Sequence, residues 1–95
     1  MLVTDSTGKA VKNNTWINDY IFVKITPSKE TASYDVYQNE SGYFGSINKN
    51  FTYYNTFDAP VTVKVVNGGV RTLKIVIKDK NGNQNICYSK NYYLK

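Results

Sequence analysis

LKIVIKDKNGNQ, residues 73–84, joins the clearest strand pattern of the chain to its clearest turn. Leu73, Ile75 and Ile77 fall on alternate positions, and such a period of two is typical of a half-buried β-strand. Asn81-Gly82 follows and is the strongest short-range hairpin signal, because both central residues of a type I′ turn have positive φ. We therefore predict a β-hairpin with a two-residue turn, in which the Asp79 carboxylate accepts hydrogen bonds from turn amides.

The oxygen-bearing side chains of this turn raise the alternative of a calcium loop made by Asp79, Asn81 and Asn83. An EF-hand loop beginning at Asp79 would need Gly at its sixth position and a bidentate Glu at its twelfth. Gly82 is the fourth residue and Lys90 the twelfth, so this loop is excluded. A surface calcium between domains, held by Asp5, Asp79 or Asn83, stays open, but we predict no metal site.

The same alternation predicts strands on both sides of the hairpin. From Trp16 to Thr26, Ile21, Val23 and Ile25 share one face, and residues 1–13 form a loose lead-in or a short edge strand. The remaining predicted strands are Ser33–Gln38, the short edge strands Tyr43–Ile47 and Phe51–Tyr54, then Val61–Val65, Val70–Lys78 and Asn85–Leu94. About seven strands, with turn residues between them and no helical periodicity, favour an all-β antiparallel sandwich or a small barrel.

Length and composition indicate one domain over residues 1–95 and weigh against catalysis. The chain has no His and one Cys, Cys87, which removes the commonest general base, the Ser-His and Cys-His pairs and any intramolecular disulfide. We therefore predict a protein that is not an enzyme and needs no cofactor. The seven carboxylates are spread over turns and strand ends, so a glycosidase-type pair has no positive support.

Charge and hydropathy bear on the partners of the chain. The net charge of +5 comes from scattered Lys residues, and Arg71 is the only arginine, so we do not expect nucleic acid as a partner. The sequence contains no apolar run long enough to span a bilayer and no signal-peptide pattern at Met1. Any secretion signal is expected to lie outside these residues.

Three motifs in order carry a resemblance to a known family. They are Thr15-Trp16-Ile17-Asn18 before a strand, Ala59-Pro60-Val61-Thr62-Val63 followed by Asn67-Gly68, and a strand that ends in Asp79-Lys80-Asn81-Gly82-Asn83. This set resembles the bacterial immunoglobulin-like domains of cell-surface and secreted proteins, over most of residues 15–85. Ile17 stands where that family usually has a small residue or Thr, and residues 43–56 match no pattern of it. The resemblance implies an immunoglobulin-like sandwich of a longer bacterial surface or secreted protein, used as an adhesin, stalk or spacer or appended to glycan-active enzymes, and it implies no catalytic residues.

The expected function is therefore that of a non-catalytic extracellular spacer or adhesion module. Its partners would be neighbouring domains of the parent chain, a glycan, or a protein of the host or cell surface. The alternative is a carbohydrate-binding module, because exposed Tyr rings offer an apolar face and a hydroxyl together. Its candidate contact residues are Tyr43, Tyr53, Tyr54 and Tyr92. A third hypothesis is a single-stranded nucleic-acid binder, since Lys residues lie among the aromatic ones in NKNFTYYN and SKNYYLK.

Two single residues also have competing interpretations. Trp16 suits ligand stacking, but its place at the start of a strand favours a core position that closes one end of the domain. Cys87 is expected to be a small buried or half-buried residue, and the sequence gives no cause for a low thiol pKa.

Overall fold

The computed structural model describes residues 1–11, 16–17, 20–39, 49–66 and 69–94. Their regular secondary structure is all β, as the sequence predicts. No helix in these ranges is long and apolar enough to cross a membrane. The strands are β1 (Leu2–Asp5), β2 (Trp16–Ile17), β3 (Ile21–Ile25), β4 (Thr31–Asn39), β5 (Phe51–Phe57), β6 (Val61–Val65), β7 (Gly69–Arg71), β8 (Leu73–Asp79), β9 (Gln84–Tyr88) and β10 (Tyr92–Leu94).

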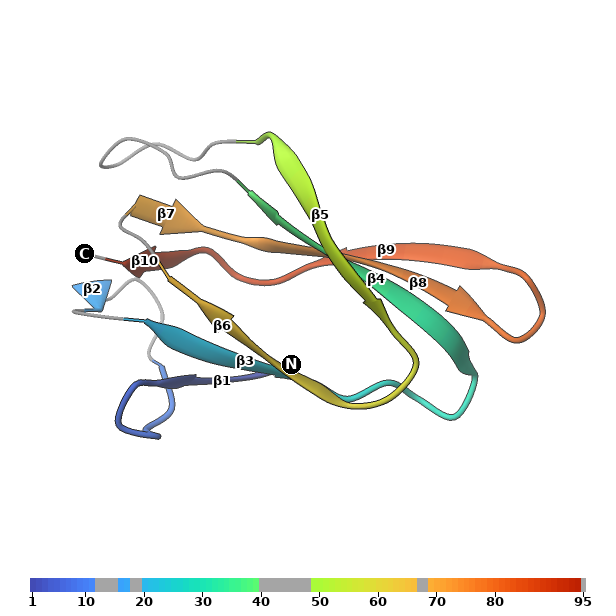
Figure 1. The fold of residues 1–95 in the computed structure, drawn as a ribbon, viewed down its shortest axis with the longest axis horizontal. Helices are drawn as coiled ribbons and strands as arrows, with labels where there is room; N and C mark the ends of the chain where they lie inside the picture. Colours follow the sequence, from blue (N-terminus) through green and yellow to red (C-terminus); the bar gives the residue numbers. More distant parts are fainter. Residues whose placement is uncertain (12–15, 18–19, 40–48, 67–68, 95) are drawn as a thin grey trace.

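These strands form three sheets. Sheet 1 has the order β1-β3-β6, sheet 2 has the order β5-β4-β8-β9, and a short end sheet has the order β2-β10-β7. Every pairing is antiparallel except that of β2 with β10. Sheets 1 and 2 lie along the long axis, and the end sheet lies at the end of the molecule that carries the C-terminus (Figure 1). The domain is elongated, with extents of 40 × 28 × 19 Å.

One apolar core lies between these sheets. Alternate residues of β3 and β6 in sheet 1 face alternate residues of β4 and β8 in sheet 2, and Leu94 of β10 closes the core at the end sheet. The hydroxyl of Tyr34 donates a 2.5 Å hydrogen bond to the Ala59 carbonyl, which ties β4 to the β5–β6 turn. Burial, together with the charge of Asp58, raises the pKa of this Tyr34 hydroxyl. The buried apolar residues of the core are Ile21, Val23, Ile25, Tyr34, Val36, Val63, Val65, Leu73, Ile75 and Leu94.

Three long predicted strands are each divided between two sheets. The stretch from Trp16 to Thr26 gives β2 and β3, Val70–Lys78 gives β7 and β8, and Asn85–Leu94 gives β9 and β10. Alternation alone does not reveal such a change of sheet. Between β9 and β10 the inward positions even change from odd-numbered (Asn85 and Cys87) to even-numbered (Tyr92 and Leu94). Phe51–Tyr54 is confirmed as an edge strand and extends to Phe57, whereas predicted strand Tyr43–Ile47 lies outside the described residues. The first residues form an edge strand at Leu2–Asp5, and Ala10 adds one bridge to Thr4.

A buried polar clamp holds the bend between β7 and β8. The Asn39 side chain is 1% exposed; its Nδ2 donates to the Val70 carbonyl at 3.0 Å, and its Oδ1 accepts from the Thr72 amide at 2.9 Å. The Asn39 amide also donates to the Thr72 carbonyl. The Thr72 hydroxyl donates to the Asn91 side-chain oxygen, and the Leu73 amide donates to the Ser89 hydroxyl. Hydrogen bonds from Thr72 and Leu73 to Asn91 and Ser89 thus join the bend between β7 and β8 to the connection between β9 and β10.

Replacing Asn39 by Ala is expected to lower the free energy of unfolding by about 2–4 kcal/mol, because the buried Val70 carbonyl and Thr72 amide would each lose a partner. Urea unfolding followed by tryptophan fluorescence measures this change. Asn55→Ala is the matched control, since Asn55 is exposed and its side-chain oxygen accepts a hydrogen bond from the neighbouring Thr56 amide; its effect should stay within about 0.5 kcal/mol. Equal effects of the two substitutions would contradict the clamp.

The hairpin between β8 and β9 is confirmed, but its predicted turn type is wrong. The Gly82 amide donates to the Asp79 carbonyl, so Lys80 and Asn81 are the central residues, and Gly82 follows them with φ of 86°. This pattern is a three-residue connection, a turn followed by a bulge at a left-handed glycine. The Asp79 carboxylate accepts from the Asn81 and Asn83 amides, as the sequence predicts.

The same turn occurs a second time, after β1. The Gly8 amide donates to the Asp5 carbonyl, Gly8 has φ of 89°, and Asp5 Oδ1 accepts from the Thr7 and Lys9 amides. The Thr7 hydroxyl donates to the same Asp5 oxygen. This hydrogen bond is the largest cause, and the amide hydrogen bonds are further causes, of a pKa of Asp5 below its ordinary value of 3.8. An Asp-x-x-Gly sequence therefore forms the turn after an edge strand or its neighbour at both places.

Gly82→Ala is expected to destabilise the fold by about 1–2 kcal/mol, because an L-residue is strained in the left-handed region. No heavy atom lies within 4 Å of a Cβ placed at Gly82, so the cost comes from the backbone alone. Asn81→Ala is the diagnostic control, since a type I′ turn would require positive φ there as well. Urea unfolding should show a loss for Gly82→Ala and little change for Asn81→Ala; comparable losses would favour the two-residue turn.

Candidate functional site

The outer face of sheet 2 carries a cluster of rings around one lysine. Alternation along β4 and β8 places Val36 and Ile75 in the core, so Tyr37 and Lys74 lie on the outer face. The register of sheet 2 sets Tyr37 opposite both Tyr53 and Lys74, and Lys74 opposite Tyr88. We call the following set the aromatic face: Tyr37, Phe51, Tyr53, Lys74 and Tyr88.

The side chains of the aromatic face contact one another across the strands. The rings of Tyr37 and Tyr53 have centroids 5.6 Å apart at an angle of 70°, and those of Phe51 and Tyr88 lie 5.8 Å apart. The Lys74 ammonium is 5.1 Å from the Tyr37 ring and 6.0 Å from the Phe51 ring. Tilted ring pairs and cations near ring faces are both favourable, so these contacts restrict the rings before any partner binds.

Much of this surface remains exposed. Tyr53 is 53% exposed and Tyr88 is 57% exposed, and the adjacent Ile86 of β9 is 53% exposed. Tyr37 and Phe51 are half-buried beneath them. Exposed apolar groups that are contiguous, rather than scattered, are typical of a contact surface.

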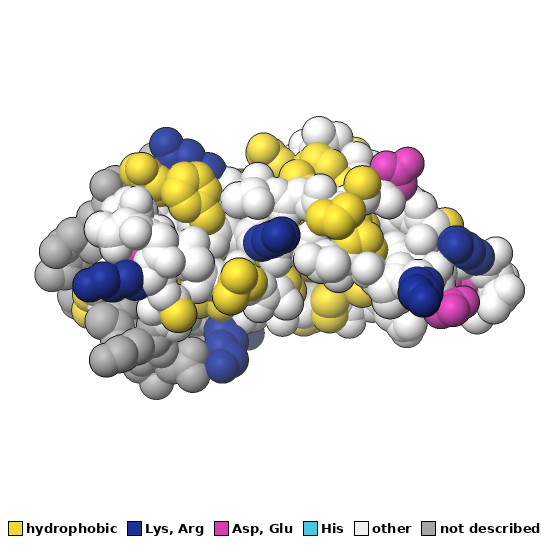
Figure 2. Space-filling view, turned by 90° about the horizontal axis from the view of Figure 1, so that it is seen from below, with side chains coloured by type: hydrophobic (Ala, Val, Ile, Leu, Met, Phe, Trp, Pro, Cys, Tyr) yellow, Lys and Arg dark blue, Asp and Glu magenta, His cyan; other side chains and the backbone are white. Residues whose placement is uncertain are grey.

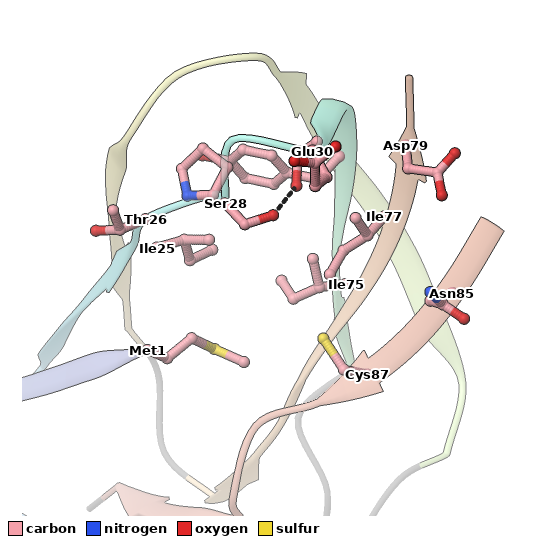
Figure 3. A pocket seen from close by; sticks show the side chains of 13 residues that line it. Met1, Ile25, Thr26, Ser28, Glu30, Ile75, Ile77, Asp79, Asn85 and Cys87 are labelled. Atoms are coloured by element: carbon pink, nitrogen blue, oxygen red, sulfur yellow. Dashed lines mark hydrogen bonds between the residues drawn. The ribbon is translucent and has the colours of Figure 1, made fainter. Parts of the chain in front are cut away.

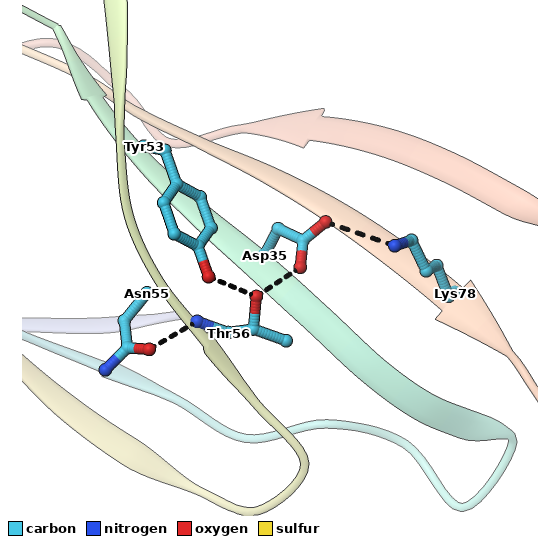
Figure 4. A network of polar contacts seen from close by, with 5 residues as sticks. All are labelled: Asp35, Tyr53, Asn55, Thr56 and Lys78. Carbon is cyan, nitrogen blue, oxygen red and sulfur yellow. Dashed lines mark hydrogen bonds and ion pairs between the residues drawn. The ribbon is translucent and has the colours of Figure 1, made fainter.

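A polar network borders the aromatic face (Figure 4). The Thr56 hydroxyl donates to Asp35 Oδ1 at 2.6 Å, and Tyr53 Oη lies 2.6 Å from the same Thr56 oxygen. Because the Thr56 hydroxyl has a single proton, the Tyr53 hydroxyl is the donor in the second bond. Lys78 Nζ lies 3.5 Å from Asp35 Oδ2 and completes the network. The Tyr53 ring is therefore held at both its edge and its hydroxyl.

The four Tyr residues proposed from the sequence do not form one site. Tyr53 lies on the aromatic face, while Tyr54 is the extra residue at an irregularity in the β4–β5 pairing and contacts Phe57 at 6.4 Å. Tyr92 is on β10, where it packs against the core and burial raises its pKa. Tyr43 lies outside the described residues.

Sequence reasoning missed three of the rings on this face. Tyr37 could have been found, because the alternation of SYDVYQ places it opposite the core residues Tyr34 and Val36. Phe51 and Tyr88 could not, since their contact requires the order of strands in sheet 2.

Trp16 and Cys87 differ from their predicted environments. Trp16 is half-buried and its ring lies 5.3 Å from that of Tyr93, while the next residue, Ile17, packs against the core. Cys87 is exposed rather than buried, because it lies on an edge strand. Partial desolvation still raises the pKa of the Cys87 thiol, so the structure gives it no activated character.

The oxygen ligands considered for calcium are far apart. The Asp5 turn follows β1, whereas the turn of Asp79 and Asn83 lies at the opposite end of the molecule (Figure 1). Within the described ranges, no group of three or more Cys, Asp and Glu residues is arranged to hold a metal ion.

On the side of β1 and β6, the described basic side chains do not form one patch. Figure 2 shows the face on the side of β1 and β6, where the drawn Lys and Arg side chains are separated by hydrophobic and polar ones. On the outer face of sheet 1, the Lys64 ammonium lies 4.1 Å from the centre of the Tyr20 ring, so this lysine makes its own cation–π contact. Arg71 is buried, donates to Gln38 at 3.0 Å, and has its pKa lowered by desolvation.

Comparisons with protein-family models, with curated proteins and with solved structures give no match for this chain. The functional proposal therefore rests on the arrangement of the chain's own residues and on the resemblance of its motifs.

Proposed function

We propose that this chain is a non-catalytic immunoglobulin-like module of a bacterial surface or secreted protein, which acts in adhesion through the aromatic face. The order of the strands supports the fold. If β1, β3, β4, β5, β6, β8 and β9 take the places A, B, C, C′, E, F and G, sheet 1 has the order A-B-E and sheet 2 the order C′-C-F-G. Immunoglobulin-like sandwiches likewise keep A, B and E in one sheet and C, F and G in the other.

The motifs of the family resemblance support the same assignment. The Trp16 motif comes before β3 at place B, Ala59-Pro60-Val61-Thr62-Val63 leads into β6 at place E, and Asp79 ends β8 at place F. These are the positions at which that family carries the corresponding motifs. A bacterial extracellular location and neighbouring domains in the parent chain are parts of the proposal that follow from this resemblance.

The aromatic face is the observation that carries adhesion. Its rings are already oriented by ring contacts, by Lys74 and by the Thr56 hydrogen bond, so binding would order few side chains. Restricting side chains before association reduces its entropic cost, and Tyr is effective in contacts because it offers large area with few rotatable bonds. A rigid elongated body of 40 × 28 × 19 Å also suits a spacer that presents such a face away from its anchor.

Carbohydrate binding is the second candidate, and the polar network favours it. Sugar rings present apolar faces flanked by hydroxyls, and Tyr53 combines an exposed ring with the neighbouring acceptors Asp35 and Asn55. Single-stranded nucleic acid remains a third hypothesis, for which Lys74 among the rings is the relevant feature.

Beads coated with the domain should adhere to a panel of immobilised host-surface proteins and bacterial and host polysaccharides. Tyr53→Ser and Tyr88→Ser should each reduce adhesion at least about tenfold, because contact residues at the centre of an interface contribute about 2 kcal/mol or more. Tyr54→Ser is the matched control: Tyr54 is 52% exposed on the same strand as Tyr53, but it lies off the aromatic face.

Adding soluble oligosaccharides or salt to the adhering beads distinguishes the three hypotheses. Soluble oligosaccharides that release the beads would establish the carbohydrate candidate, and adhesion that collapses with moderate salt and is restricted to single-stranded DNA would establish the third. Beads that adhere to nothing on the panel, or that lose adhesion equally in all three Tyr variants, would refute adhesion through this face.

A further inference from the structure

An open flank runs between sheets 1 and 2, along β1 and β9. A cavity of about 380 Å³ lies at the end of the flank near the β8–β9 hairpin, and a second of about 370 Å³ lies near the β9–β10 connection. Met1 lines both cavities, so they are neighbours along one flank. Figure 3 shows Ile75 and Ile77 on the wall of the first cavity, with Met1 and Cys87 at its lower side.

The flank is open because β9 extends beyond the cover that sheet 1 provides. Asn85 and Cys87 pair with the inward-facing Ile77 and Ile75 of β8, so their side chains point toward the space between the sheets. Both are nevertheless exposed. An apolar wall that would be core elsewhere in the domain is here accessible from the side.

The backbone of β9 has its spare hydrogen-bonding groups on this same edge. The Asp79 amide donates to the Asn83 carbonyl and the Ser89 amide donates to the Leu73 carbonyl, which fixes these two as hydrogen-bonded pairs of the β8–β9 ladder. Hydrogen-bonded and non-hydrogen-bonded pairs alternate in an antiparallel ladder, so Asn85 and Cys87 bond to β8. The amides and carbonyls of the intervening residues therefore point outward, away from β8: Gln84, Ile86 and Tyr88.

β9 also lacks the residues that usually protect an edge strand. Its five residues, QNICY, include no Pro and no charged side chain, and it is the last strand of sheet 2 in the described part of the chain. An extended, uncharged edge is a template on which another strand can pair.

The charges along the flank indicate what kind of strand fits. Among the described side chains, those of Glu30 and Asp79 and no Lys or Arg line the first cavity, whereas Lys90 and no Asp or Glu lines the second; the amino-terminal residue Met1, whose charge acts on Cys87, lines both. A strand lying along β9 would present alternate side chains to these cavities. It would match the flank with a cation at the hairpin end, apolar residues in the middle and an anion beside Lys90.

We propose that the flank binds an extended peptide segment of a partner protein, which pairs with the free edge of β9. Main-chain hydrogen bonds to Gln84, Ile86 and Tyr88 provide affinity, and alternate side chains in the two cavities provide specificity. The recognised segment has Lys or Arg, two small apolar residues and Asp or Glu at alternate positions. This site differs from the aromatic face, which lies on the outer side of sheet 2, and it does not depend on the adhesion proposal.

The probes are two synthetic peptides with blocked ends, Thr-Lys-Thr-Val-Thr-Val-Thr-Glu-Thr and its reverse. The pair covers both strand directions, because reversal changes backbone polarity while keeping the charge order along the flank. In an amide NMR titration of the labelled domain, one of the two should give saturable shifts at Gln84, Ile86 and Tyr88. The matched control Thr-Val-Thr-Lys-Thr-Glu-Thr-Val-Thr has the same composition and should bind at least about tenfold more weakly, a difference of about 1.4 kcal/mol.

Two variants of the domain test the pairing itself. Ile86→Pro removes an outward amide without removing a bond to β8, so it should leave the domain folded and weaken peptide binding at least about tenfold. Ile86→Thr makes the matched control, because it changes the same side chain but keeps the amide and should bind like the natural chain. In the double variant Glu30→Lys with Lys90→Glu, the preferred peptide should switch to the other of the pair.

Absence of saturable shifts with both peptides at millimolar concentration would overturn the proposal. So would shifts confined to Tyr37, Phe51, Tyr53 and Lys74, or full binding by a folded Ile86→Pro variant. Sedimentation of the peptide-free domain is the remaining measurement: a concentration-dependent dimer that Ile86→Pro abolishes would show that a second copy, and not a partner peptide, occupies the edge.

Discussion

The buried amide of Asn39 is the constraint on which the arrangement of strands depends. It replaces a stretch of sheet ladder with side-chain hydrogen bonds to Val70 and Thr72, and so allows one continuous run of chain to leave the end sheet and enter sheet 2. A buried backbone group without a partner is costly, and the Asn39 side chain supplies the bonds that this bend would otherwise lack. The same residue ends β4 opposite Phe51, and this pairing sets the register of β4 and β5 that brings Tyr37 beside Tyr53. Asn39 therefore contributes both to the hydrogen bonds of the β7–β8 bend and to the strand register that forms the aromatic face.

Both candidate binding surfaces meet at β9 because of the two-residue period of a strand. Ile86 and Tyr88 extend the outer face of sheet 2, while Asn85 and Cys87 point toward the flank. The free backbone groups lie on the third side, in the plane of the sheet. A short edge strand with no charged residue can thus contribute to two contacts without a change in fold, and substitutions of its side chains and of its backbone affect them separately.

Much of the fold could be predicted from local pattern, since the period of two identifies Val61–Val65 and places Tyr34 and Val36 toward the core. The division of Val70–Lys78 at Thr72 could not be predicted, because it depends on Asn39, which lies 33 residues earlier in the chain. The hairpin at Asp79 was predictable, but its type depends on which amide bonds the Asp79 carbonyl. At the candidate site, the exposed ring of Tyr53 was identified, whereas its neighbours depend on strand order, which no local pattern contains. Long-range pairing thus determines most of what the sequence leaves open.

The charge of the chain explains why the edge of β9 suits a foreign strand better than a copy of itself. With a net charge of +5, two copies repel as they approach. An edge contact of five residues per copy buries much less than the roughly 1,200 Å² of the smaller stable interfaces, so it offers little to offset that repulsion. A peptide with one cation and one anion avoids the repulsion and fills both cavities, and this difference selects a partner strand over self-association.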